Sequence, residues 1–519
     1  MTSVQRFDPH VLVRLLALPI LLIGVLCAHQ SASAESLPPG YAERPNFITQ
    51  YEIAPILVED DLSKIKVTVK FRNDGDGRVL FRLPDSFGAA NDYWELVDNL
   101  SVEGAIHSLL GDGVLVLTSK PGNPIIISYE VRAGYSFPQA LDGDLPDAGP
   151  MIFPAWFHAV GEMIIPTIDG LEEKRADLRW VGWPGSWDHM SSADEIDALL
   201  STMSTVRKSN FLAGAELTIM EQSIEGGTLR VGMVNIPPEN VDKVMETTRE
   251  TIAAQGELFQ SDGFPYTVAY VGLPTDYDLP LSRGLGRKHG YSIFTSGPFF
   301  RPGLQYGLAN AHTQTWLPDK LGRMPGNPDD IHWFTEGMLE YFTLQTLTRS
   351  GLWNRRQYVG RLNQVLNRYG RSRFVGVSNA RLVDGIGNDL EKTFQSKDRG
   401  FLFAVATDRL LREQEGNLDV VIYRMMADWK RTPPRDQPAV IESFIEESRQ
   451  SGIHIQSSIH RHIDLGIPIL LQADIFGECA KIVTEKITPR DSETGRHARW
   501  RQRVILLSDD KAVPCNIGH

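Results

Sequence analysis

The sequence predicts a multidomain α+β protein, because its periodicity changes twice along 519 residues. From about residue 45 to 135, apolar and polar side chains alternate, which is the period of half-buried strands. Helical patterns dominate after about residue 228, and the last 60 or so residues return to short strand-like runs. Strands and helices that are segregated in this way indicate an α+β protein rather than repeated β-α units.

Residues 1–34 are predicted to be a secretory signal peptide. MTSVQRFDPHVLVR is mildly basic, LLALPILLIGVLCA is apolar, and Ala32-Ser33-Ala34 offers a small-residue cleavage site. The apolar run is shorter than the roughly 20 residues that cross a bilayer, and no later stretch approaches that length. We therefore expect a periplasmic or secreted protein with no transmembrane segment after signal removal.

Residues 35–200 are predicted to form an antiparallel β-sandwich. In KIKVTVKF, Ile65, Val67, Val69 and Phe71 share one face of a strand. The turn cluster NDGDG follows, and VLFRLP, GVLVLTS and NPIIISYEV read as further short strands separated by Gly, Pro and Asp.

Residues 201–435 are predicted to be mainly helical. TLRVGMVNI and YTVAYVGLP read as strands, and between them PPENVDKVMETTRETIAAQGELF opens with proline and continues as an amphipathic helix. DDIHWFTEGMLEYFTLQTLTRSGL and the largely apolar RGFLFAVATDRLLREQEG are further helices. Residues 436–519 are predicted to be a helix and strand region, with strands in IPILLQADIFG and QRVILLS.

Removal of the signal leaves two cysteines, Cys479 and Cys515. An oxidising compartment favours a disulfide between them, which would tie the C-terminal tail to the last domain. The alternative is two free thiols. The formal net charge of −13 argues against a nucleic-acid partner, because nucleic acid must be bound through neutralisation of its phosphates.

The sequence lacks several motifs that are typical of particular enzyme classes. There is no GxSxG of a serine hydrolase, no GxxxxGK[ST] phosphate loop and no CxxC. GLGRKHG (284–290) lacks the third glycine of a dinucleotide loop at the required spacing. Serine hydrolase, P-loop and dinucleotide-binding chemistry are therefore not indicated.

A resemblance to a known family rests on LPDKLG followed by WFTEG (333–337), on RGFLFAVATDRLLR and on GIPILLQADIFGECAK. These segments resemble the glycyl aminopeptidase family of zinc metallopeptidases, without the PDZ domain of its longer members. The resemblance implies a thermolysin-like fold for residues 201–435. In such a site, HExxH supplies two histidine ligands and the general base, and a Glu from a second helix completes the zinc ligands. Glu336 of WFTEG matches that third ligand.

The sequence lacks HExxH. Aligning Trp316-Leu317-Pro318 with the family places Asn310 and Gln314 at the two histidine positions and Ala311 at the catalytic Glu. A second register instead places His312 at the second histidine. Both registers lose the general base, and amides are poor zinc ligands.

Two further segments depart from the family pattern. The segment that resembles GGLEHxxS reads LGRKHGYS here, with Lys288 at the Glu and His289 retained. Lys397 stands where the family usually has a tyrosine before RG. We expect Lys288, His289 and Lys397 to line the former active cleft, where a lysine would repel a peptide N-terminus.

These departures predict a non-catalytic pseudo-peptidase that binds a peptide, another envelope protein or a small acidic ligand, without a cofactor. The alternative is an active metallo-aminopeptidase with a rearranged zinc site. His332 and Glu336 are four residues apart and share a helix face, and His312 would be the third ligand.

Overall fold

The structure is a computed structural model. Lys288, His289, Trp316 and the predicted signal peptide lie outside the residues that it describes. The described residues are 48–73, 77–85, 92–134, 149–194, 201–224, 227–259, 266–273, 281–287, 290–315, 317, 321–387, 389–433, 436–487, 499–510 and 513–517.

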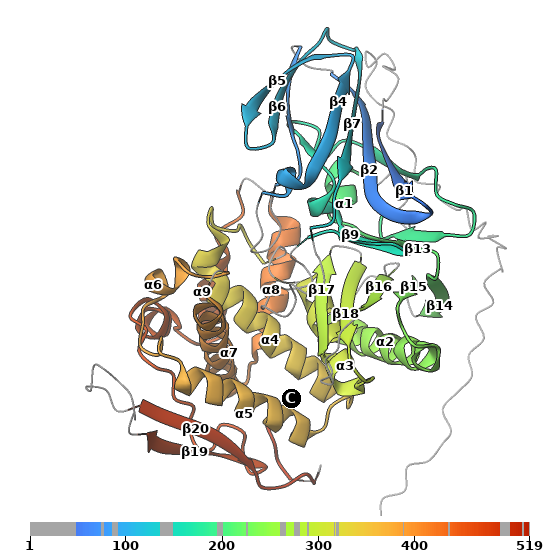
Figure 1. The fold of residues 1–519 in the computed structure, drawn as a ribbon. Coiled ribbons are helices and arrows are strands. Elements are labelled where there is room, and N and C mark those ends of the chain that lie inside the picture. Colours follow the sequence, from blue (N-terminus) through green and yellow to red (C-terminus); the bar gives the residue numbers. More distant parts are fainter. Residues whose placement is uncertain are drawn as a thin grey trace, which may run out of the picture. The chain divides into compact units, whose positions relative to one another are not determined.

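The N-terminal region contains two sheets that share one core (Figure 1). Alternation places Ile65, Val67, Val69 and Phe71 inside that core, as the sequence predicts. The first sheet, in the order β11-β1-β2-β7-β4, contains β11 (Ala176–Trp180), β1 (Thr49–Val58), β2 (Asp61–Arg72), β7 (Pro124–Val131) and β4 (Val97–Glu103). The second, in the order β10-β3-β6-β5, contains β10 (Thr167–Ile168), β3 (Arg78–Arg82), β6 (Val114–Thr118) and β5 (Ile106–Gly111).

A third sheet joins strands from both sides of the boundary predicted at residue 200. Its order is β12-β13-β9-β8, with β12 (Asp188–Ser191), β13 (Asn210–Gly214), β9 (Trp156–Val160) and β8 (Met151–Phe153). The short helices η1 (Tyr93–Leu96), η3 (Gly161–Met163) and α1 (Met203–Arg207) lie between these strands in the sequence. Because backbone hydrogen bonds cross residue 200, this part of the chain is continuous with the next.

A fourth, five-stranded sheet is contacted by α2 (Pro238–Phe259) and α3 (Arg301–Gln314). Its order is β14-β15-β16-β18-β17, with β14 (Thr218–Ile224), β15 (Gly227–Val234), β16 (Tyr266–Gly272), β18 (Gly290–Ser296) and β17 (Leu281–Arg287). β17 is therefore an edge strand, and among the described strands it pairs only with β18.

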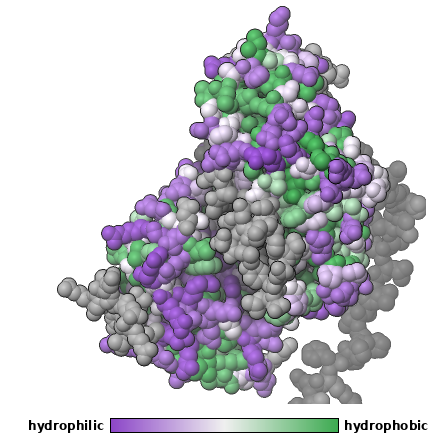
Figure 2. All heavy atoms as spheres, in the orientation of Figure 1, coloured by the Kyte–Doolittle hydropathy of each residue, from purple (hydrophilic) through white to green (hydrophobic). Residues whose placement is uncertain are grey.

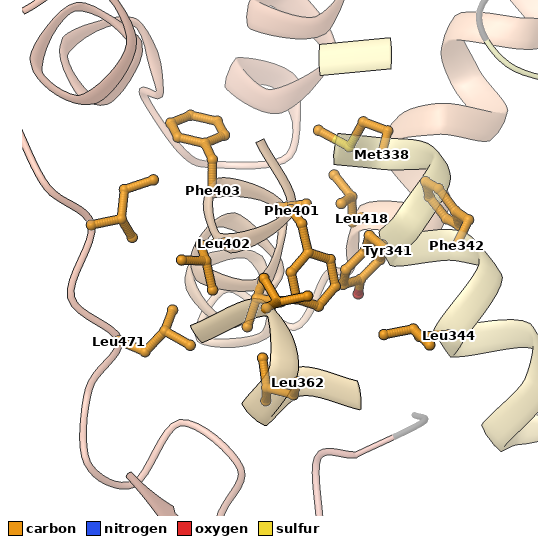
Figure 3. Close-up of a cluster of buried hydrophobic side chains, with 14 of the residues drawn as sticks. Met338, Tyr341, Phe342, Leu344, Leu362, Phe401, Leu402, Phe403, Leu418 and Leu471 are labelled. Carbon is orange, nitrogen blue, oxygen red and sulfur yellow. The ribbon is translucent and has the colours of Figure 1, made fainter. Parts of the chain in front are cut away.

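The remaining elements are mostly helices around a large apolar core, part of which Figure 3 shows, including Tyr341, Phe401 and Leu418. They are η4 (Pro328–Ile331), α4 (His332–Arg349), α5 (Arg355–Arg371), α6 (Asn379–Val383), α7 (Leu390–Arg412), α8 (Leu418–Arg431), α9 (Val440–Gln450), α10 (Gln456–Ile459) and the π-helix η6 (His460–Asp464). No described helix is both long and apolar enough to cross a membrane.

Two glycines let α4 and α7 cross with their backbones in contact. A Cβ built on Gly337 would lie 2.6 Å from Phe401 N, and one built on Gly400 would overlap Trp333 O. These glycines belong to the WFTEG and DRG segments, so both segments supply the surface at which the helices meet. The crossing places Lys397, about one turn before Gly400, next to the residues that flank Gly337.

The C-terminal region confirms one prediction and corrects another. Cys479 and Cys515 form a disulfide, and β19 (Ala480–Ile487) pairs with β20 (Arg499–Leu506), which includes QRVIL of the predicted strand QRVILLS. IPILLQADIFG, in contrast, forms no strand. The backbone of Leu471 in that segment bonds to the Gln502 side chain instead of to a neighbouring strand.

We predict that Gly337→Ala destabilises the protein by about 1–3 kcal/mol or more, because the added methyl group forces two packed helices apart. Gly360→Ala is the matched control. Gly360 is also within a helix, but a Cβ there meets nothing within 4 Å, so alanine should stabilise the helix by about 0.5–1 kcal/mol. Urea unfolding measures both changes, and equal effects of the two substitutions would contradict the proposed crossing.

Candidate functional site

Helix α3 lies directly on β17 because two glycines remove the side chains between them. A Cβ at Gly284 would overlap Gly307 O and lie 2.9 Å from Ala311 Cβ. A Cβ at Gly286 would overlap Ala311 O. Residues 284 and 286 share one face of the strand, so these two glycines form a helix-packing surface. The placement of α3 in turn decides where its polar side chains lie.

Asn310 and Gln314 lie one turn apart and interact with each other. Gln314 Nε2 donates to Asn310 Oδ1 at 3.4 Å, and Gly286 N donates to Gln314 Oε1 at 2.7 Å. Asn310 is 9% exposed, and its Nδ2 makes no hydrogen bond within the structure. These hydrogen bonds fix the two side-chain amides. The Nδ2 group of Asn310 has no hydrogen-bond partner among the described residues.

His312 lies on a different side of α3, about 200° around the helix from Asn310. Its ring is fully buried and contacts the rings of Tyr266 at 5.4 Å and Tyr291 at 5.5 Å between centroids. Both tyrosines belong to the core beneath the helix. The structure thus places His312 in the sheet core and does not bring it together with His332 and Glu336. Across the described residues, no three His, Cys, Asp or Glu side chains form a group that could hold a metal ion.

Glu336 and Lys397 meet at the crossing of α4 and α7. Lys397 Nζ lies 3.8 Å from Glu336 Oε2 and 3.1 Å from Glu340 Oε2. Glu336 is half-buried, whereas the side chain of Glu340 is 1% exposed. The ammonium group therefore neutralises the carboxylate that the family resemblance assigns to zinc, together with a second carboxylate one turn further into the protein.

Two residues that the sequence analysis did not identify complete this charge cluster. Arg361 of α5 binds Glu340 through Nε, at 2.7 Å from Oε1, and through Nη2, at 3.2 Å from Oε2. Tyr306 of α3 donates its hydroxyl hydrogen to Glu340 and accepts a hydrogen bond from Arg361 Nη2 at 2.8 Å. Helical spacing is the sequence signal that could have identified part of this cluster. Glu340 follows Glu336 by four residues and Tyr306 precedes Asn310 by four, so each pair shares one face of a helix.

Interactions within the cluster favour the charged forms of Glu340 and Lys397. Burial by itself would raise the pKa of Glu340, but Lys397 and Arg361 hold that pKa far below its ordinary range. Burial would lower the pKa of Lys397, but Tyr306 and the two carboxylates hold it above the ordinary value. Burial and the adjacent Glu340 raise the pKa of Tyr306 to about 12. At neutral pH Glu340 is therefore a carboxylate, Lys397 and Arg361 are cations, and Tyr306 is a neutral phenol.

His332, at the start of α4, is an uncharged side chain at neutral pH. Burial lowers its pKa more than the adjacent Glu336 raises it, and the charge of Lys397 adds a further, smaller lowering. Its Nδ1 is buried and makes no hydrogen bond within the structure. His332 and Glu336 lie on adjacent turns of one helix, and no described His, Cys, Asp or Glu joins them as a third ligand.

The residues present do not fit a zinc ion. A zinc ligand set needs His, Cys or carboxylate atoms at about 2.0–2.3 Å from the metal. At the positions suggested by the resemblance, α3 offers amides that already bond to each other and to β17. The remaining carboxylate, Glu336, lies beside the ammonium of Lys397, which would repel a divalent cation. No step that requires zinc can be derived from this arrangement.

Comparison with known proteins supports a peptidase relationship. Residues 324–393 match the M61 glycyl aminopeptidase family. This segment includes Glu336 and the WFTEG helix but neither α3 nor Lys397. A search of curated proteins found no match.

The chain is also similar to the crystal structure of an aminopeptidase N family protein from Idiomarina loihiensis. The TM-score is 0.67 with 17% sequence identity, and the similarity covers 86% of this chain and 80% of that chain. At this identity the similarity establishes the fold alone, and it confirms the predicted α+β class. The absence of a PDZ domain stays a prediction.

We predict that Glu340→Gln lowers stability at neutral pH by about 3–5 kcal/mol, because it leaves buried cations without their carboxylate. The folded-state pKa of Glu340 is lowered, so its stabilising effect is present above the unfolded pKa of about 4.3 and is lost as the pH falls below it. The difference between wild type and variant should therefore shrink toward pH 3 in urea unfolding.

Glu446→Gln is the control for this prediction. Glu446 pairs with Arg449 on the exposed face of α9, where an ion pair contributes little. A Glu340→Gln variant that is no less stable than Glu446→Gln would contradict the role assigned to the buried cluster.

Proposed function

We propose that this chain is an exported, non-catalytic relative of the glycyl aminopeptidases that binds a peptide segment at the surface of α3, α4 and β17. The observation that carries the proposal is the position of Lys397, whose ammonium lies 3.8 Å from Glu336 Oε2 and 3.1 Å from Glu340 Oε2. The ammonium group of Lys397 thus supplies the positive charge next to Glu336 that a metal ion would otherwise supply.

Loss of hydrolysis follows from the residues of α3. Ala311 stands at the position of the general base in the register aligned on Trp316-Leu317-Pro318, and an alanine cannot accept a proton. Ala311 is fully buried, and it faces Gly284 of β17. Loss of a general base alone costs about two to four orders of magnitude in rate. The loss of zinc ligands at Asn310 and Gln314 would remove the activated water as well.

A peptide is the occupant that the surrounding groups favour. β17 is an edge strand, and extended peptides bind by adding a strand to such an edge. Asn310 Nδ2 and His332 Nδ1 are buried polar atoms without hydrogen-bond partners in the structure, and such atoms are usually satisfied by a ligand or by ordered water. Lys397 is already paired with two carboxylates, so it gives no reason to prefer a small acidic ligand.

We predict that the wild-type protein binds no zinc stoichiometrically and that zinc binding requires both new ligands and removal of the lysine charge. Asn310→His combined with Gln314→His should gain weak binding. Adding Lys397→Met should strengthen it by at least about tenfold, because an ammonium about 4 Å from Glu336 opposes a dication. Zinc titration against a fluorescent chelator measures each affinity.

Lys397→Met alone is the control and should not bind zinc, because the amides of α3 remain. About one tightly bound zinc per wild-type chain would overturn the proposal. Equal zinc affinities for the double and triple variants would show that Lys397 does not oppose the metal. Circular dichroism establishes that each variant is folded before it is titrated.

A further inference from the structure

Arg399 of α7 is a fully buried arginine. Hydrophilic residues gather over the neighbouring helix α5 in Figure 2, and the side chain of Arg356 on that helix is 80% exposed. Arg399, in contrast, is 0% exposed. Burial lowers the pKa of Arg399, but an arginine side chain stays protonated in proteins. A full positive charge is therefore enclosed among the helices.

The guanidinium group of Arg399 has no counter-charge among the described residues, because no Asp or Glu of this set forms an ion pair with it. The adjacent carboxylate, Asp398, binds Arg368 instead, with 2.7 Å between Arg368 Nε and Asp398 Oδ2. Arg399 Nη2 donates to the backbone oxygen of Val377 at 2.6 Å, and the hydroxyl of Tyr369 also interacts with the guanidinium group. These two partners offer dipoles but no negative charge, and burying an unpaired charge is costly.

Further polar atoms close to Arg399 on α7 have no hydrogen-bond partner among the described residues. They are Nε and Nη1 of Arg399 itself, both amide atoms of Gln395 and the hydroxyl oxygen of Ser396. Gln395 is 1% exposed and Ser396 is 0% exposed. At about 100° per residue, these three side chains project from α7 within an arc of about 100°, which we call the polar arc. Lys397 projects about 200° away from Arg399, so the polar arc is separate from the charge cluster around Glu340.

Other segments of the chain enclose the end of the Arg399 side chain. Tyr369 belongs to α5, and its hydroxyl accepts a hydrogen bond from Ile469 N at 3.1 Å. The oxygen of Val377, which binds Arg399, would lie 2.4 Å from a Cβ built on Gly466. The backbone around residue 466 therefore packs directly on the segment that holds the guanidinium group. Any ligand of the polar arc must be small, since none of the three side chains reaches solvent.

We propose that a chloride ion binds in the polar arc of α7, against the guanidinium group of Arg399, with Ser396 Oγ and Gln395 Nε2 as further donors. Chloride supplies the missing negative charge and accepts hydrogen bonds from N–H and O–H groups. A water molecule would satisfy hydrogen bonds but would leave the charge unpaired. A monatomic ion suits side chains that are closed off from solvent better than a phosphate or an organic acid does. The site is independent of the peptide-binding surface proposed above.

Urea unfolding at increasing chloride concentration tests the site, with gluconate replacing chloride so that the ionic strength stays constant. Chloride that binds only the folded chain stabilises it, so the urea midpoint of the wild type should rise with chloride. Arg399→Met should lose this dependence. Arg356→Met is the matched control, because it removes an exposed arginine, and it should respond to chloride like the wild type. Circular dichroism confirms that each variant is folded before unfolding.

Ser396→Ala tests the position of the ion while the charge of Arg399 is retained, and it is the variant to use if Arg399→Met does not fold. Loss of one donor to an anion should raise the chloride concentration needed for stabilisation by about tenfold. Ser448→Ala is its control, since Ser448 of α9 is also 0% exposed and its hydroxyl also has no hydrogen-bond partner among the described residues. Ser448→Ala should leave the chloride dependence unchanged.

Crystals grown with bromide in place of chloride locate the ion directly, because bromide is identified by its anomalous scattering. We expect a bromide peak beside Arg399. A wild type whose stability does not depend on chloride, or a dependence that survives Arg399→Met, overturns the site and leaves the guanidinium group to water. Bromide on the surface only, or equal chloride dependence of Ser396→Ala and Ser448→Ala, overturns the position of the ion in the polar arc.

Discussion

The backbone contact between α4 and α7 determines the environment of Glu336 and Glu340. Gly337 and Gly400 are the residues that permit it, since a side chain at either position would overlap the other helix. Once the helices touch at these points, Lys397 must lie beside Glu336 and Glu340. The same crossing lets aromatic and aliphatic side chains such as Tyr341 and Phe401 join one core (Figure 3).

The charge cluster shows how the protein's own side chains compensate a buried carboxylate. A buried carboxylate is costly unless a cation or several donors compensate it. Glu340 receives two cations and a phenol, and Glu336 shares one of those cations. The charges balance within the protein, so no external ion is needed for that purpose. The amides of Asn310 and Gln314 similarly satisfy each other and β17, apart from one N–H donor group of Asn310.

Much of the candidate site follows from helix periodicity, and the rest depends on partners distant in the sequence. Spacing alone places Asn310 and Gln314 on one face of a helix and His312 on another. It does not reveal that His312 packs against Tyr266 and Tyr291, because those tyrosines come from two strands of the sheet. The sequence does not reveal the cluster around Glu340, because Arg361 belongs to α5 and Lys397 to α7, whereas Glu340 belongs to α4. The sequence identifies Lys397 only as a residue of the cleft that stands where the family usually has a tyrosine.

The sequence by itself determined the alternation of the sandwich strands, the helices of the middle region and the cysteine pair, because these depend on local periodicity and residue chemistry. It also determined that Glu336 stands in a peptidase-like helix while the HExxH motif is missing from the sequence. Only the tertiary structure decided that Lys397 pairs with Glu336 and that IPILLQADIFG bonds to a side chain instead of forming a strand. Both outcomes require contact between segments that are far apart in the sequence. Such contacts depend on tertiary packing, which the periodicity of a single segment does not predict.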